Sequence, residues 1–432
     1  MRPPRFGKNS ASLCCPLGVT TRLDAITDEP EDMNTTQPSQ RDHRIDFVRG
    51  LALIMIFINH IPGNIVGELT SRNFGFSDAA EIFVLLAGVS SAFAYYRRYE
   101  AGQPFYTSVR VWRRAGFLYT AHILTAVLAI ALFAAASIYF NDPRLAGQIG
   151  IRTILDAPAA GLLGIAALTH QLSFFNILPL YIALLAMLPA MMFLYRRDIR
   201  LLLALSVALY LAASFFRITP PGFPTPHAWH FNPLCWQLLF VAGFCWGDLW
   251  RRGVHVERNR ILFWTAVAYL VFSLVWMLVD FLPYFPVYGG LGELWGFSKT
   301  YLAPFRLLHV LALAYVIAMC PLGGLLRRFG ADNPLVQIGR HALPVFCVGS
   351  LLSMLFFILR TKVAAGIVPD VLMVLVGITI LVGFARFLEW QAATPAGQVG
   401  SQMATGFVAA TPPVPPPVNY NLPLRGAALP PA

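Results

Sequence analysis

Long apolar segments are the feature that most constrains the fold of this chain. About ten of them follow one another, and each is close to the roughly 20 residues that a helix needs to cross about 30 Å of hydrocarbon. Because a helix satisfies its own backbone polar groups in lipid, the sequence predicts an all-α, polytopic membrane bundle of about ten transmembrane helices. The segments lie near residues 45–62, 79–96, 115–139, 172–195, 199–216, 233–250, 261–281, 303–320, 342–359 and 368–389.

The charge content supports a membrane protein and argues against a nucleic-acid binder. Only 12% of the residues are charged, whereas soluble domains carry about 25%. The net charge of +11 comes from short Lys and Arg clusters between apolar segments, and no basic stripe with interleaved aromatic residues is present. The six cysteines include no C-x-x-C pair, so we expect buried thiols rather than a redox or metal site.

Composition divides the chain into three parts. Residues 1–40 are polar and contain no apolar signal segment, and residues 391–432 are rich in Pro, Ala and Gly, so both tails are predicted to be disordered. Residues 41–390 form the predicted transmembrane domain. Within it, the segment 157–169 is too short to cross a membrane and is interpreted as interfacial or re-entrant.

The distribution of Lys and Arg predicts the orientation. Alternating crossings from a cytoplasmic N-terminus place four clusters inside, and the outside loops then hold about half as many Lys and Arg. The positive-inside rule therefore favours both termini in the cytoplasm. The four clusters lie at residues 97–114, 196–200, 251–260 and 327–340.

The first apolar segment carries three ionisable side chains that lipid alone would not tolerate. Asp46 and Arg49 are three residues apart and pair on one helical face. His60 follows eleven residues after Arg49, which is about three turns and about 16 Å along the same face. Two alternatives stay open: a snorkelling role for Arg49, and a structural role for His60 as an interfacial histidine bound to a carbonyl.

Polar residues of several other segments are expected at the depth of His60. Together they predict a hydrated cavity open to the outside, although capping and interhelical hydrogen bonding explain some of them individually. The residues are Asp78, Glu81, Asn176, Gln237, Arg306 and His309.

At the inner level, Arg113, Arg340 and His341 are expected to meet Arg49 around an anionic group, with lipid phosphates as the alternative ligand. Arg386 and Glu389 are expected to form a structural pair. The remaining histidines show no ligand spacing, and no metal site is predicted.

The pattern Arg49, ten residues, His60 on a first membrane helix resembles the signature of the acyltransferase 3 superfamily. Longer segments between residues 42 and 389 resemble the OpgC family, membrane proteins linked to succinylation of osmoregulated periplasmic glucans. They are RDHRIDFVRGLALIMIFINHIPGN, SRNFGFSDAAEIFVLLAG, LSFFNILPLYIALL, FNPLCWQLLFVAG, APFRLLHVLALAY and GRHALPVFCVGSLLS. The resemblance implies a bacterial inner-membrane protein in which His60 is essential for acyl transfer and an acyl-CoA is the donor.

These observations suggest a mechanism. Arg49, with Asp46 as its neutralising partner and Arg113 and Arg340 as helpers, binds CoA phosphates, and the thioester reaches His60. His60 then acts as general base on a glucan hydroxyl or forms an acyl-histidine.

Further residues are assigned to the outer side of this mechanism. Asp78 or Glu81 orients His60, while Arg306 or Lys299 recognises a succinyl carboxylate, and His309 joins the substrate-binding residues. The acyl-CoA, with succinyl-CoA favoured, is a substrate, and no cofactor is expected to be bound permanently. The alternatives are O-acetylation of another surface glycan and transport of a glycan or lipid without chemistry.

Overall fold

The computed structural model describes residues 42–254, 257–279, 294, 296–320, 329–363 and 366–394. The regular elements in these ranges are helices, and the β-type pairing within them is an isolated bridge between Pro221 and Ala228. The predicted all-α class is therefore confirmed. The disorder predicted for residues 1–40, and for all but the first four residues of the C-terminal tail, falls outside the described residues.

A helix occurs at every one of the predicted membrane segments. The helices are α1 (His43–Asn59), α2 (Ala79–Ser91), α4 (Pro104–Tyr139), α8 (Ile177–Arg197), α9 (Ile199–Phe215), α10 (Pro233–Arg251), α11 (Arg260–Leu278), α12 (Pro304–Met319), α15 (Ala342–Lys362) and α16 (Ile367–Ala393). Helix α2 continues through a π-helical turn (Ala92–Tyr96) into α3 (Arg97–Glu100).

Shorter elements connect these helices. They are the 3-10 turns Ile65–Leu69, Ser71–Asn73 and Gln148–Gly150, and the helices α5 (Pro143–Ala146), α6 (Ile151–Asp156), α7 (Pro158–Ala166) and α14 (Pro334–Arg340). Helix α7 occupies the segment predicted to be interfacial or re-entrant, and its 9 residues are too few to span a bilayer.

The length and hydropathy of each helix show whether it could span a membrane. In the described residues 6 helices are long and apolar enough to cross, namely α2 with α3, α4, α8, α11, α15 and α16, and α9 and α12 are shorter apolar helices. The chain is therefore a multi-pass membrane protein. Ten spans require that α1, α9, α10 and α12 also cross, and this stays a prediction because none of the four is among these six helices.

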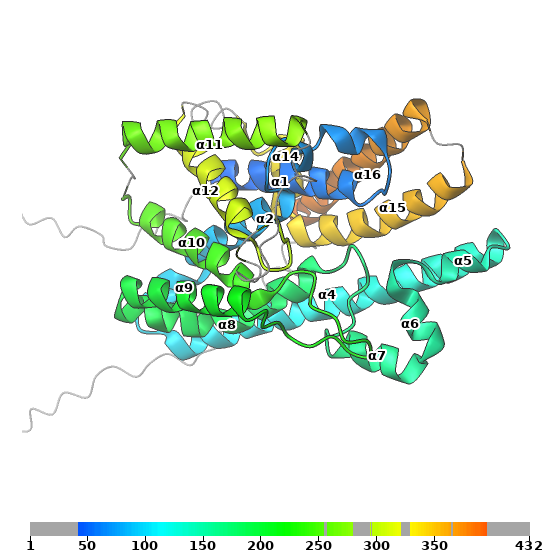
Figure 1. Cartoon of the computed structure of the whole chain (residues 1–432), viewed down its shortest axis with the longest axis horizontal. Helices are drawn as coiled ribbons and strands as arrows, with labels where there is room; N and C mark the ends of the chain where they lie inside the picture. Colours follow the sequence, from blue (N-terminus) through cyan, green and yellow to red (C-terminus); the bar gives the residue numbers. More distant parts are fainter. Residues whose placement is uncertain are drawn as a thin grey trace, which may run out of the picture. The chain divides into compact units, whose positions relative to one another are not determined.

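Helix α1 lies inside the bundle, where it packs against α14, α2 and α15, and α2 in turn packs against α10 (Figure 1). Two of these crossings depend on glycine. A Cβ atom on Gly339 would overlap the carbonyl oxygen of Asp46, and one on Gly243 would overlap that of Leu85. Small residues let helix backbones approach closely in membranes, and this approach holds α1 at a fixed depth among its neighbours.

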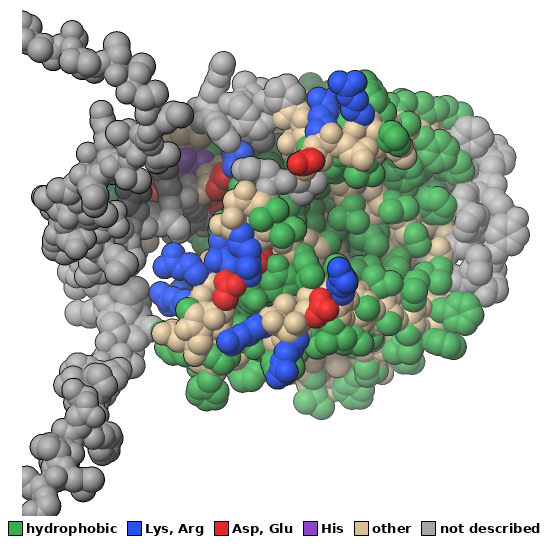
Figure 2. Space-filling view, turned by 90° about the vertical axis from the view of Figure 1, so that its left-hand side faces the viewer, with side chains coloured by type: hydrophobic (Ala, Val, Ile, Leu, Met, Phe, Trp, Pro, Cys, Tyr) green, Lys and Arg blue, Asp and Glu red, His purple; other side chains and the backbone are tan. Residues whose placement is uncertain are grey.

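Ion pairs gather helix ends on one side of the bundle. Glu100, which follows α2, binds Arg251 at 2.8 Å and Arg252 at 2.6 Å. The fully buried Asp248 of α10 accepts a hydrogen bond from Tyr195 of α8 at 2.9 Å. Figure 2 shows Lys and Arg side chains spread over part of one face, next to an area of hydrophobic side chains. These contacts bring together loops that the sequence pattern assigns to the same side of the membrane.

The opposite helix ends are joined by hydrogen bonds. Tyr210 of α9 donates to the Leu302 carbonyl at 3.0 Å, and the Asn232 backbone N–H donates to Thr300 at 3.0 Å. The segment before α12 is thereby fixed against the outer ends of α9 and α10. This places the start of α12 beside the start of α2, where the candidate site is found.

Candidate active site

The turn that follows α1 carries His60, and its shape is set by the side chain of Asn64. The Asn64 amide donates to the carbonyls of Ile58 at 2.9 Å and Ile61 at 2.6 Å, and its oxygen accepts from the Gly67 backbone N–H at 2.8 Å. The Ile58 carbonyl belongs to the last turn of α1 and that of Ile61 to the turn that follows, so this buried amide ties the helix end to the turn. His60 is therefore held at a defined C-terminal end rather than on a frayed turn.

An ion pair from two distant helices fastens the same turn. Arg360 of α15 binds Asp370 of α16 at 2.8 Å and also donates to the carbonyls of Pro62 at 3.3 Å and Gly63 at 2.5 Å. Asp370 in turn accepts from the Ile65 backbone N–H at 3.0 Å. Sequence reasoning missed both residues. Their signal was weak, because each is an ordinary charge near the end of an apolar segment.

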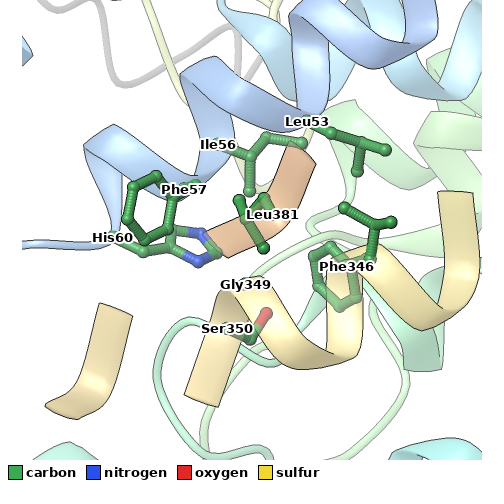
Figure 3. A pocket seen from close by; sticks show the side chains of 9 residues that line it. Leu53, Ile56, Phe57, His60, Phe346, Gly349, Ser350 and Leu381 are labelled. Atoms are coloured by element: carbon green, nitrogen blue, oxygen red, sulfur yellow. The ribbon is translucent and has the colours of Figure 1, made fainter. Parts of the chain in front are cut away.

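The His60 side chain points into a small pocket between α1, α15 and α16 (Figure 3). Its Nδ1 atom is buried and has no hydrogen-bond partner among the described residues. The imidazole lies against Phe174, with ring centroids 5.2 Å apart. The pocket is lined by Leu53, Ile56, Phe57, His60, Val345, Phe346, Gly349, Ser350 and Leu381. The unpartnered Nδ1 atom can accept a hydrogen bond from a bound hydroxyl, which is the contact that a general base requires.

The predicted pair of Asp46 and Arg49 is present at 2.9 Å. Arg49 also donates to the Gly339 carbonyl at 3.2 Å and to the hydroxyl of Ser90 on α2. Its side chain is 13% exposed. The guanidinium thus sits where α1, α2 and α14 meet, three helical turns before His60.

Of the other residues predicted at the inner level, Arg340 and His341 contact a carboxylate, whereas Arg113 is exposed. Arg340, next to Gly339 on α14, pairs with Glu389 of α16 at 3.0 Å, and His341 Nε2 lies 3.3 Å from the same carboxylate. The expected pairing of Arg386 with Glu389 is wrong, because the packing of α14 on α16 brings Arg340 and His341 to that carboxylate instead. Arg113 is exposed on α4 and forms no ion pair with a described residue.

Four charged side chains form the outer charged cluster, which we define as Asp78, Glu81, Lys299 and Arg306. Asp78 and Glu81 form a capping box, in which both carboxylates accept hydrogen bonds from backbone N–H groups at the start of α2. Lys299 binds Asp78 at 2.5 Å, and Arg306 binds Glu81 at 2.6 Å and Asp78 at 3.5 Å. Glu81 is fully buried.

The contacts of the outer charged cluster are made among its own side chains and with backbone N–H groups. No hydrogen bond joins Asp78 or Glu81 to His60 in the described structure, and the carboxylates bind the cluster cations and backbone N–H groups instead. Orientation of His60 by one of these carboxylates therefore stays a prediction.

The remaining outer polar residues have protein partners. His309 Nδ1 lies 2.7 Å from the Ser77 hydroxyl, and its ring packs directly over Gly75. Gln237 exchanges hydrogen bonds with Ser206 of α9, including its donation to the Ser206 carbonyl at 2.8 Å, and Asn176 donates to Gln171 at 3.3 Å. In the described ranges no group of His, Cys, Asp or Glu is arranged to hold a metal ion.

Fold and site together define a multi-pass α-helical membrane protein with a half-buried histidine at the end of its first helix. A family model described as OpgC protein matches residues 41–393. The chain therefore belongs to the OpgC family, as the sequence resemblance predicted, and this membership relates it to succinylation of osmoregulated periplasmic glucans. Comparisons with curated proteins and with solved structures find no match.

Proposed function

We propose that this protein is an inner-membrane acyltransferase that moves a succinyl group from cytosolic succinyl-CoA to hydroxyls of periplasmic glucans. The observation that carries the proposal is His60, whose unpartnered Nδ1 is buried where α1 ends and whose ring points into an apolar pocket (Figure 3). Family membership supports the acyl-transfer chemistry.

The proposed reaction uses both ends of α1. Arg49 at the inner level binds a phosphate of the donor, with Arg340 and Arg113 as further cations and Asp46 holding the guanidinium in place. The thioester reaches His60, which takes the proton of a glucan hydroxyl as that oxygen attacks the carbonyl carbon. The C–S bond breaks, and the CoA thiolate takes the proton from the imidazolium.

The proposed orientation places both termini in the cytoplasm and His60 near the periplasmic face. Reporter fusions test it: we expect a fusion after residue 70 to report the periplasm and one after residue 105 to report the cytoplasm. The expectation rests on the excess of Lys and Arg in the loops assigned to the inside. Exchanged signals would place His60 at the cytoplasmic face and overturn the orientation.

Selection of a succinyl group is proposed to involve Arg306 or Lys299, with His309 nearby. Lys299 is the more accessible cation, since its side chain is 30% exposed and that of Arg306 is 14% exposed. Both already face carboxylates of the outer charged cluster, so a succinyl carboxylate would compete with Asp78 for Lys299. The selectivity role requires that Lys299→Gln lowers succinyl transfer more than acetyl transfer.

The function itself is tested with the full-length protein in lipid nanodiscs, supplied with succinyl-CoA or acetyl-CoA and purified osmoregulated glucan. We expect succinyl esters on the glucan by mass spectrometry, and their absence from glucans of a deletion strain. Acetyl esters alone would favour an O-acetyltransferase. Glucan or lipid movement without thioester consumption would favour a transporter, and either result would contradict the proposal.

A further inference from the structure

Ser350, which lies in the segment GRHALPVFCVGSLLS but received no role in the sequence analysis, has a buried hydroxyl without a partner among the described residues. Its side chain is 3% exposed, and its Oγ atom has no hydrogen-bond partner among the described residues. Hydroxyls in helices ordinarily bond to a preceding carbonyl. Ser353, one turn further along α15, does so: it donates to Gly349 at 2.7 Å and to Phe57 at 3.1 Å.

An unpartnered buried hydroxyl is unfavourable, which makes Ser350 a candidate for binding a group absent from the free protein. The hydroxyl lines the same pocket as His60, and Figure 3 shows both side chains directed into it. The other walls are apolar and come chiefly from Leu53, Phe346 and Leu381. The pocket therefore offers one donor and one imidazole to an occupant that is otherwise apolar.

The acyl-bearing end of a thioester has this chemistry. Its sulfur and the adjacent methylene groups suit apolar walls, and its carbonyl oxygen is a single acceptor at the carbon that reacts. The succinyl carboxylate does not suit these walls and would lie outside the pocket, toward the outer charged cluster. A methyl group on Gly349 would fit beside Ser350 in ordinary contact, since its Cβ atom would lie 3.6 Å from the nearest atoms, the methyl groups of Leu381. A phosphate or a free sugar would leave most of its polar atoms unpartnered in this pocket.

We propose that the Ser350 hydroxyl donates a hydrogen bond to the carbonyl oxygen of the donor thioester beside His60. The inference rests on the proposed acyl transfer. When the acceptor oxygen attacks, the carbonyl π electrons move to oxygen, and Ser350 stabilises the resulting oxyanion while His60 holds the acceptor's proton. The oxyanion then re-forms the carbonyl, the C–S bond breaks, and the thiolate takes the proton from His60.

Steady-state transfer from succinyl-CoA to purified glucan, by the full-length protein in nanodiscs, tests the role of Ser350. We expect Ser350→Ala to lower kcat by about 10² to 10³-fold, as loss of an oxyanion donor typically does. The KM for succinyl-CoA should change by less than about threefold, because the hydrogen bond strengthens mainly in the transition state. Gly349→Ala should instead raise the KM, since its methyl group enters the pocket without a backbone clash.

Ser353→Ala is the matched control, because this hydroxyl is equally buried on the same helix but already has protein partners. We expect this variant to keep kcat within about threefold of wild type, because in the wild-type protein the Ser353 hydroxyl is already bound to the carbonyls of Gly349 and Phe57 and is not available to the donor. If Ser350→Ala keeps wild-type kcat while His60→Ala loses transfer, Ser350 has no such role and the proposed function stands. If the wild-type protein transfers no acyl group, the proposed function and this inference both fall.

Discussion

His60→Ala is expected to abolish most glucan acylation while leaving the protein inserted and folded. Loss of a general base typically lowers the rate by about 10² to 10⁴-fold, and more if the residue also carries the acyl group. Folding should tolerate the change, because the Nδ1 atom has no partner to lose among the described residues and removing an imidazole reduces the polar groups near lipid. The turn itself is held by Asn64 and Arg360, which the substitution leaves in place.

The measurement is succinyl content of periplasmic glucans in a deletion strain that carries each variant at matched membrane abundance. His43→Ala is the control, since His43 begins α1 at the opposite end and lines no part of the pocket. We expect it to keep near wild-type acylation. If His60→Ala retains more than about a tenth of wild-type transfer, well above the range for a lost base, His60 is structural and the catalytic assignment fails.

Arg306→Met is expected to reduce stability more than any other single change in the outer charged cluster. Glu81 is fully buried, and Arg306 is the cation that binds it, at 2.6 Å. Removing one partner of a buried pair leaves an uncompensated charge, which typically costs about 3 to 5 kcal/mol. A loss of this size approaches the whole stability of many proteins, so low abundance in the membrane should follow.

The double variant Arg306→Met with Glu81→Gln separates charge burial from other effects. Because it removes both charges and keeps an amide oxygen for the capping box, it should recover most of the thermal stability measured in detergent. Arg152→Met is the control, since Arg152 and Asp156 form an exposed pair with side chains 75% and 62% exposed, worth about 0 to 1 kcal/mol. Wild-type stability of Arg306→Met alone would show that Glu81 is not held by this pair.

Residue spacing within a single helix correctly predicted two of the contacts in the candidate site. Asp46 and Arg49 are i, i+3 neighbours, so helical geometry alone brings them together, and the structure has the pair. Asp78 and Glu81 have the spacing of a capping box for the same reason, and they form one. Arg386 and Glu389 have the same i, i+3 spacing but do not pair, because Arg340 of α14 binds the Glu389 carboxylate instead.

The sequence by itself therefore determined the class of protein, its helices and the helix that carries His60, because lipid permits little besides long apolar helices and because three turns of one helix fix Arg49 and His60 on one face. Only the tertiary structure decided what surrounds that histidine. Arg360 reaches the turn at Pro62 across 298 positions of sequence, and Arg306 reaches Glu81 across 225. Such contacts depend on which helices pack against each other. Hydropathy does not predict this packing, because all the apolar helices have similar hydropathy.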